Sequence, residues 1–309
     1  MTMDQIINLL AAITLFEMMI AIGLGVTFGE ILGVVRDFRL LIRAAAANYV
    51  VVPAAAVGLL FLFHAQPLAA AGFLIAAVCP GAPYGPPFTS LARGKVIVAV
   101  GLMVMLAGSS ALLAPLLLQL LLPLMGDQPL EINAVKMVAT LFLSQLLPLC
   151  IGLCVRQYRP LLAEKLQKPA NLLSMILNLL LLGIIIVVQF DMLVGIPLRA
   201  FAGMLLLVLA TLIIGWLFGG RGSNDRKTMA IITSVRNAGV CLVIAASSFP
   251  GTPAVTAATA YALFQTIVIA LVAVGWGRLN LAPEREATAQ PTPIDSALKE
   301  TVSSANPVH

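Results

Sequence analysis

The chain has 309 residues, of which 61% are hydrophobic and only 10% are charged. A water-soluble globular domain carries about a quarter charged residues, so this composition excludes that class and indicates a polytopic membrane protein. The net charge of +5 comes from short loops between apolar runs. Basic loops of this kind orient a membrane protein, and we do not expect nucleic acid as a partner.

Nine apolar runs follow one another, each of about 20–30 residues, a length that spans a bilayer as a helix. They lack the alternation of outer-membrane barrel strands. The sequence therefore predicts an all-α polytopic membrane protein with nine transmembrane helices. The predicted spans are 4–28, 40–63, 67–92, 95–125, 131–155, 169–190, 196–219, 228–249 and 253–277.

The two ends of the chain differ in character. Residues 4–28 have no basic n-region and no small-residue cleavage site, so we expect a retained first helix instead of a signal peptide. Residues 281–309 are rich in Pro, Ser, Thr and Ala and predict a disordered cytoplasmic tail. Residues 1–280 are then expected to form a single nine-helix domain.

Basic residues gather in alternate loops. On the opposite side the loops carry Arg199, with Lys136 just inside a span. The positive-inside rule places the N-terminus outside and the C-terminus in the cytoplasm, and we expect a multi-pass protein of the cell (inner) membrane. The basic side carries Arg36, Arg39, Arg43, Arg93, Lys95, Arg156, Arg159, Lys165, Lys168, Arg221, Arg226, Lys227, Arg278 and Arg285.

The third run is interrupted by CPGAPYGPPFTSLARG, residues 79–94, with four prolines and two glycines within eight positions. A continuous helix cannot pass through, because each proline removes a backbone donor and clashes with the preceding turn. Non-helical backbone at membrane depth is tolerated only where protein buries it or water reaches it. A plain proline kink is the alternative, but residues 79–89 favour a cavity lining. Its candidate substrate-binding residues are Pro83, Tyr84, Gly85, Pro86, Pro87 and Thr89.

The eighth run holds the most polar cluster inside any span, TSVRNAG, residues 233–239. Arg236 lies near mid-depth, where an arginine costs at least about 2.5–3.5 kcal/mol on insertion scales. It is either an anion-binding group, because guanidinium grips carboxylates with paired donors, or the partner of Glu17 in a structural ion pair. The candidate substrate-binding residues here are Thr233, Ser234, Arg236 and Asn237, with Asn48 of the second run.

Spans three and eight run in opposite directions, as expected for an inverted repeat with two crossed discontinuous helices, about 67–92 and 228–249. The helix N-termini at the crossing would direct partial positive charge at one site. The four cysteines and two histidines show no metal-binding spacing, so we expect neither a metal nor a cofactor. No nucleophile, base or metal arrangement lies at depth, which argues against an enzyme.

Three segments resemble the bile acid:sodium symporter family. CPGAPYGPPFTSLARGKVIVAV is similar to its first crossover segment, with a CPGG-type opening and a T-x-L-A-[RK]-G ending. VRNAGVCLVIAASSF is similar to the second, centred on Asn-x-Gly, and NYVVVPA to the helix before the first, where the family often has Gln in place of Asn48. The resemblance reaches to about residue 280. It implies an elevator-type transporter of organic anions, with a core domain around the crossed helices and a panel domain.

The departures from the family concern sodium. Where sodium-coupled members carry a Ser-Asn pair, this chain has Gly85 and Pro86, and Ala99 and Met103 stand where hydroxyl residues are usual. Ile232 replaces a Glu, and Arg236 replaces a Gln. Hard cations need oxygen ligands, which these apolar side chains lack, and Arg236 would repel a cation. The resemblance therefore implies that both usual sodium sites are absent, and we expect no metal at them.

The expected function is secondary transport of a small organic anion, not coupled to sodium at the usual sites. Arg236 would act as a permanent counter-charge; alternatively, Glu17 would titrate and couple protons. A sodium- or proton-coupled symporter of bile-acid-like anions remains an alternative, as does a non-transporting sensor on the same fold. The expected partners are the organic anion and the lipid bilayer.

Overall fold

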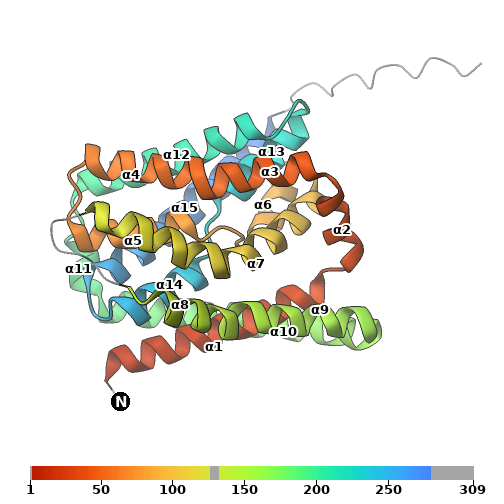
Figure 1. Ribbon diagram of the computed structural model, residues 1–309, viewed down its shortest axis with the longest axis horizontal. Coiled ribbons are helices and arrows are strands. Elements are labelled where there is room, and N and C mark those ends of the chain that lie inside the picture. The colour runs from red at the N-terminus through yellow and green to blue at the C-terminus, as the bar shows by residue number, and fades with distance from the viewer. Residues whose placement is uncertain (1, 126–131, 280–309) are drawn as a thin grey trace, which may run out of the picture.

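The computed structural model describes residues 2–125 and 132–279, and every regular element in these ranges is a helix (Figure 1). The predicted tail, 281–309, lies outside the described residues. The first half contains α1 (Met3–Gly25), α2 (Phe28–Arg36), α3 (Phe38–Ala46), η1 (Ala47–Val51), α4 (Val52–Leu62), α5 (Pro67–Val78), α6 (Gly85–Leu91), α7 (Val96–Leu121) and η2 (Leu122–Met125). The second half contains α8 (Ala134–Leu141), η3 (Phe142–Leu146), α9 (Leu147–Tyr158), α10 (Pro160–Val188), α11 (Phe190–Val194), α12 (Leu198–Phe218), α13 (Ser223–Ser234), α14 (Ala238–Ser248) and α15 (Pro253–Arg278).

The predicted all-α polytopic membrane fold is confirmed. In the described ranges, eight helical segments are long and apolar enough to cross a membrane. The count of nine is not confirmed, because the predicted span 67–92 consists of two shorter helices, α5 and α6. The segment 223–248 is counted as one span although its helix is interrupted between α13 and α14.

Two predicted boundaries need correction on the arginine-rich side. The first span ends at Gly25, not at 28, and the loop after it contains α2, which begins with a capping box between Thr27 and Glu30. The sixth span begins at Pro160, not at 169, and Pro169 lies inside α10. Proline is well suited to the first turn of a helix, and the following Leu, Ala, Glu, Lys and Gln residues are good helix formers.

The helices form three groups in space (Figure 1). Packed on one another, α1, α9 and α10 lie along the bottom of the view, while α3, α4 and α12 lie along the top. The helices α5, α6, α7, α14 and α15 lie between them, and α13 lies beside α12 at the top. In the central apolar window of 223–248, 94% of the residues are buried, against 11% in α10, so the second interrupted pair is the centre of the molecule.

Close backbone approach between α1 and α9 depends on glycine. An added Cβ at Gly23 would lie 2.6 Å from the carbonyl oxygen of Leu149 and 2.8 Å from the Cα of Gly152. An added Cβ at Gly152 would lie 2.5 Å from the carbonyl oxygen of Ile20. Small residues of this kind let membrane helices pack at short distance, which fixes α1 against α9.

Two spans contain a short π-helical segment just before a proline. In the second span η1 leads into α4, which has Pro53 in its first turn, and in the fifth span η3 leads into α9 with Pro148. Because a proline ring clashes with the carbonyl four residues earlier, a local widening of the helix accommodates it. These segments also carry the buried amide side chains of Asn48 and Gln145.

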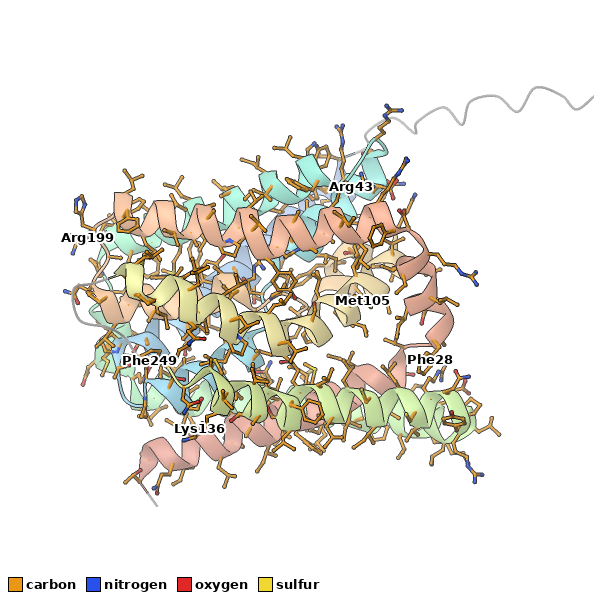
Figure 2. All side chains as sticks on the ribbon, viewed as in Figure 1. Phe28, Arg43, Met105, Lys136, Arg199 and Phe249 are labelled. Carbon is orange, nitrogen blue, oxygen red and sulfur yellow. The ribbon has the colours of Figure 1, made fainter. Side chains whose placement is uncertain are left out.

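The polar ends of the molecule are opposite one another along the helices. Arg43 lies at the end that holds α2, and Arg199 lies at the other end, where α4 meets α5 (Figure 2). Arg43 and Arg199 therefore lie at opposite ends of the molecule.

Candidate functional site

The two interruptions meet in the centre of the molecule. The backbone N–H of Asn237 donates to the carbonyl of Cys79 at 2.9 Å, and its side-chain Nδ2 donates to the carbonyl of Gly81 at 3.2 Å. Asn237 Oδ1 also accepts a bond of 3.2 Å from the N–H of Val240, which caps α14. One asparagine thus satisfies backbone groups of both interruptions, which is required where water is absent.

The first interruption depends on Gly81. Its φ is +85°, a backbone conformation that side-chain-bearing residues rarely adopt. An added Cβ at Gly81 would lie 2.3 Å from the backbone nitrogen of Ala107 in α7. The extended stretch between α5 and α6 therefore lies directly on α7.

Arg236 occupies the second interruption and is only 1% exposed. Its backbone is paired by Gln265 of α15, whose Oε1 accepts from the Arg236 N–H at 3.2 Å and whose Nε2 donates to the Arg236 carbonyl at 3.1 Å. Its side chain donates through Nη1 to Oδ1 of Asn48 at 3.1 Å. Asn48 in turn donates through Nδ2 to the carbonyl of Ala44 at 2.9 Å and to Thr233 Oγ1 at 3.4 Å.

Two guanidinium nitrogens of Arg236, Nε and Nη2, are buried and have no hydrogen-bond partner. These two N–H groups lie along one edge of the planar guanidinium group and point in the same direction. Such an edge matches the two oxygens of a carboxylate. Leaving a charged donor buried and unpaired is costly, so the free edge of Arg236 indicates a place for an oxyanion.

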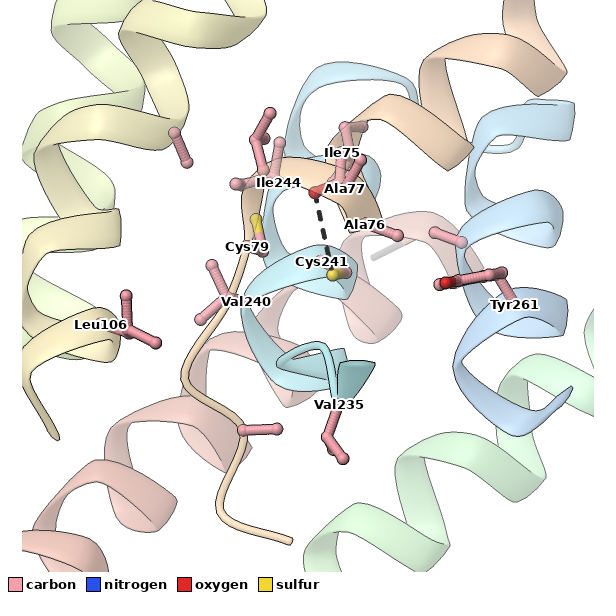
Figure 3. Packing of buried hydrophobic residues seen from close by; sticks show 14 of the residues in the cluster. Ile75, Ala76, Ala77, Cys79, Leu106, Val235, Val240, Cys241, Ile244 and Tyr261 are labelled. Carbon is pink, nitrogen blue, oxygen red and sulfur yellow. Dashed lines mark hydrogen bonds between the residues drawn. The ribbon is translucent and has the colours of Figure 1, made fainter. Parts of the chain in front are cut away.

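A tyrosine hydroxyl adds a third unsatisfied group. Tyr261 is 1% exposed, and its hydroxyl has no hydrogen-bond partner. Tyr261 precedes Gln265 by four residues on α15, so both side chains leave the helix on the same face. Figure 3 shows Tyr261 directed toward the side of Cys241, in the helix that begins at the Arg236 interruption. The hydroxyl and the free guanidinium edge therefore belong to one buried polar region.

The alternative pairing of Arg236 with Glu17 is not present. Glu17 accepts a hydrogen bond from Ser174 of α10 and is only partly buried. Among the described residues the ion pairs are Lys95 with Asp225 and Arg156 with Glu164. Arg236 has a neutral amide as its side-chain partner, and its charge is not compensated by a carboxylate of the described chain.

The other predicted site residues lie in different surroundings. Asn48, Gly85, Pro86, Thr89, Thr233, Ser234 and Asn237 are buried, Pro83 and Tyr84 are partly buried, and Pro87 is exposed. The hydroxyls of Thr89 and Ser234 donate to the carbonyls of Gly85 and Ala230 in their own helices. Asn178 of α10 donates to the Tyr84 hydroxyl, which ties the first interruption to the α1–α9–α10 group.

The positions that the resemblance predicts to stand in place of sodium ligands are apolar and packed. Ala99, Met103 and Ile232 are 0%, 4% and 2% exposed. An added Cβ at Gly85 would lie 2.6 Å from Cδ1 of Ile232, so the isoleucine side chain already fills the space beside the start of α6. In the described ranges, no group of three His, Cys, Asp or Glu side chains is placed to hold a metal ion.

Sequence reasoning did not identify Gln265, Tyr261 or Tyr49 as neighbours of the interruptions. The Tyr49 hydroxyl lies 2.8 Å from the carbonyl of Leu106 and 2.7 Å from Ser109 Oγ, which fixes η1 against α7. A signal was present for Gln265, since an amide in the middle of an apolar span needs a partner. Its partner, the backbone of Arg236, lies 29 residues earlier and is identified only by the fold.

Comparisons with known proteins agree with these motifs. The profile of the "Sodium Bile acid symporter family" matches residues 12–196 of the chain. The chain is also similar to the "Uncharacterized sodium-dependent transporter YocS" of Bacillus subtilis (strain 168), with 24% identity over 276 residues. That alignment covers 86% of this chain and 83% of the relative.

Proposed function

Because the chain belongs to the sodium bile acid symporter family, a family of membrane transporters, we propose that it carries a small organic anion across the membrane. We further propose that Arg236 supplies the positive charge for that anion and that sodium does not bind at the usual family sites. The residues proposed to surround the substrate are Asn48, Pro83, Tyr84, Gly85, Pro86, Pro87, Thr89, Thr233, Ser234, Arg236 and Asn237.

One observation carries this proposal: a fully buried guanidinium with a free edge at the point where both interruptions meet. A structural arginine would be expected to have its N–H groups paired by carbonyls or a carboxylate. Arg236 has only Asn48 on Nη1, which leaves two donors and the full charge for a ligand. An anion bound there would gain charge-assisted hydrogen bonds in a region of low dielectric.

The apolar packing around Gly85 supports the absence of sodium coupling. Sodium needs several oxygen ligands, as hard divalent cations do. Ile232 instead packs beside Gly85, and Ala99 and Met103 are buried without a side-chain oxygen. Arg236 would also repel a nearby cation. At a separation of about 4 Å and an effective ε of 20, this repulsion is on the order of 4 kcal/mol.

Transport itself is proposed to follow an elevator motion. In this proposal α1, α8, α9 and α10 form the panel, and the interrupted helices with α3, α4, α7, α12 and α15 form the moving core, all within residues 1–280. The hydrogen bond between Asn178 and Tyr84 joins the proposed panel to the first interruption and would have to break in each cycle. The arginine-rich ends would face the cytoplasm of the cell inner membrane, with the N-terminus outside.

The name of the relative, a sodium-dependent transporter, favours a second candidate, a sodium-coupled symporter.

Counterflow in proteoliposomes distinguishes transport from a sensor role. Vesicles loaded with one unlabelled organic anion are tested for uptake of the labelled anion. We expect uptake by the wild type and none by Arg236→Ala. If a panel of carboxylates, sulfonates and phosphonates gives neither uptake nor a thermal shift in folded protein, the transporter proposal is wrong.

A further inference from the structure

A cavity lies away from Arg236, at the end of the molecule that carries Arg199. Its volume is about 530 Å³, and its walls come from α4, α5, the α11–α12 connection, α12 and α15. Binding pockets for small molecules have volumes of about 300–1,000 Å³ and mostly apolar walls with a few polar groups. The cavity has both properties, and the proposed anion site at the two interruptions does not use it.

The cavity is polar at one end and apolar along its length. Arg199, Gly203 and Leu207 all line it and follow one another at intervals of four residues along α12. Residues at this spacing lie on one face of a helix and extend over about 12 Å, at 1.5 Å per residue. The wall therefore runs from an exposed arginine to a buried leucine.

The other walls of the cavity also change from exposed polar residues at the Arg199 end to buried apolar residues deeper in. His64, in the connection between α4 and α5, is exposed at the Arg199 end, whereas Ala56 and Leu60 line the deeper part from α4. Arg199 and His64 are the titratable side chains of the lining, and no carboxylate lines it within the described chain. Figure 2 shows Arg199 at the outer edge of the molecule, at the end opposite Arg43.

The deep wall of this cavity is shared with the Arg236 region. Phe73 and Ala260 line the cavity, and the Phe73 ring packs edge-on against Tyr261 with centroids 6.0 Å apart and an interplanar angle of 82°. Tyr261 carries the unpaired hydroxyl near Arg236. The Phe73–Tyr261 pair therefore lies between the cavity and the Arg236 region, and the two do not form one continuous cavity.

From this gradient of charge and hydrophobicity we infer a second binding site for an amphipathic monoanion, with its acidic head at Arg199 and its apolar body along Gly203 and Leu207. The inference does not depend on the proposed transport function, since it uses a different cavity and different residues. A free long-chain acid and an anionic lipid of the bilayer share this chemistry.

The glycines of the chain offer a matched pair of substitutions. An added Cβ at Gly203 would meet only the Phe63 ring, at 3.7 Å, so Gly203→Leu fills the cavity without a backbone clash. Gly58 of α4 has nothing within 4 Å of an added Cβ and does not line the cavity. Gly58→Leu is therefore the control for adding a leucine to the lipid-facing surface.

The experiment uses dodecanoate with a photoreactive diazirine in its chain, added to the full chain in nanodiscs of phosphatidylcholine. We expect labelled peptides from 56–73, 195–207 and 253–260. Labelling there should fall at least tenfold in Gly203→Leu and Arg199→Gln but not in Gly58→Leu. Equal labelling in Gly203→Leu and wild type, or equal labelling by the uncharged dodecanol analogue, would overturn the proposal. If Gly203→Leu does not fold, undiminished labelling of the surface variant Arg199→Gln overturns it.

A second arm identifies the source of the anion. Part of the phosphatidylcholine is replaced by phosphatidylglycerol, whose headgroup is anionic. Loss of dodecanoate labelling at the same peptides in the wild type assigns the cavity to an anionic lipid of the bilayer. Unchanged labelling assigns it to free acids.

Discussion

Arg236 Nη1 donates to Asn48 Oδ1 at 3.1 Å, and this bond joins residues 188 positions apart in the sequence. It orients the guanidinium group so that Nη1 is used within the protein while Nε and Nη2 remain free. The asparagine is neutral and therefore holds the arginine without cancelling its charge. The account of anion binding depends on this combination of fixed geometry and uncompensated charge.

The first prediction concerns the shape of the arginine head. Arg236→Lys keeps the positive charge but loses the paired donors, and a charge-assisted hydrogen bond contributes about 1.5–3 kcal/mol. We therefore expect anion affinity to fall about tenfold or more in Arg236→Lys and to vanish in Arg236→Ala. Binding is measured by thermal shift and confirmed by equilibrium binding of the labelled anion.

Glu17→Gln is the control for that series. Since Glu17 contacts Ser174 and not Arg236, this variant should bind the anion as the wild type does. Wild-type affinity in Arg236→Ala, together with unfolding of Glu17→Gln, would instead support an ion pair between the two residues.

The second prediction concerns a carboxylate that the protein itself supplies as a partner of the Arg236 guanidinium group. Asn48→Asp is nearly isosteric and would form a buried ion pair with Arg236 in place of the present 3.1 Å hydrogen bond. We expect the protein to fold with a melting temperature at or above that of the wild type and to lose organic-anion binding, because the charge is already compensated. Thermal melts with and without the anion measure both effects.

Asn48→Leu is the companion variant. It removes the acceptor for Nη1, and leaving a buried polar group unpaired costs about 1–3 kcal/mol, so its melting temperature should fall. Anion binding by Asn48→Asp at wild-type affinity would contradict the role of the uncompensated charge.

A third prediction tests the first interruption. Gly81→Ala combines a φ of +85° with an added Cβ 2.3 Å from the Ala107 nitrogen, so α7 would have to move. Such strain costs on the order of 1–3 kcal/mol from the backbone alone, and we expect loss of folded protein in size-exclusion chromatography. Gly108→Ala, whose nearest neighbour would be Leu146 at 3.8 Å, should behave as the wild type.

The fourth prediction concerns the bond between the first interruption and α10. Asn178 donates to the Tyr84 hydroxyl, so Tyr84→Phe and Asn178→Leu remove the same interaction from its two sides. A double-mutant cycle in denaturant should give a coupling of about 0.5–1.5 kcal/mol, since residues in one hydrogen bond do not act additively. Additive effects of the two changes would show that the bond does not stabilise this arrangement.

Much of the centre of the fold could be predicted from local sequence. Pro80, Pro83, Pro86 and Pro87 with two glycines predict an interruption, and α5 does end at Val78. The interruption is shorter than predicted, because Pro86 and Pro87 lie in the first turn of α6, where proline is tolerated. Arg236 was identified as a buried polar group from its depth in an apolar run, and it is 1% exposed. These predictions succeed because they depend on backbone rules and on the cost of burying charge.

The contacts that could not be predicted are those between side chains far apart in the sequence. Glu17 was a reasonable partner for Arg236 by charge alone, but Ser174 lies beside Glu17 and Asn48 beside Arg236. Gln265 was overlooked because its contacts are to a backbone distant in sequence. The Arg199 cavity was also not predicted, since its apolar walls do not differ in composition from any lipid-facing or core helix surface.

The central claim is that Arg236 replaces sodium as the positive charge for the anion. It is tested most directly by counterflow of a labelled organic anion in proteoliposomes, with sodium on both sides or with potassium replacing it on both sides. We predict equal initial rates in the two buffers and no uptake by Arg236→Ala in either. Uptake that requires sodium and stops in potassium would contradict the claim.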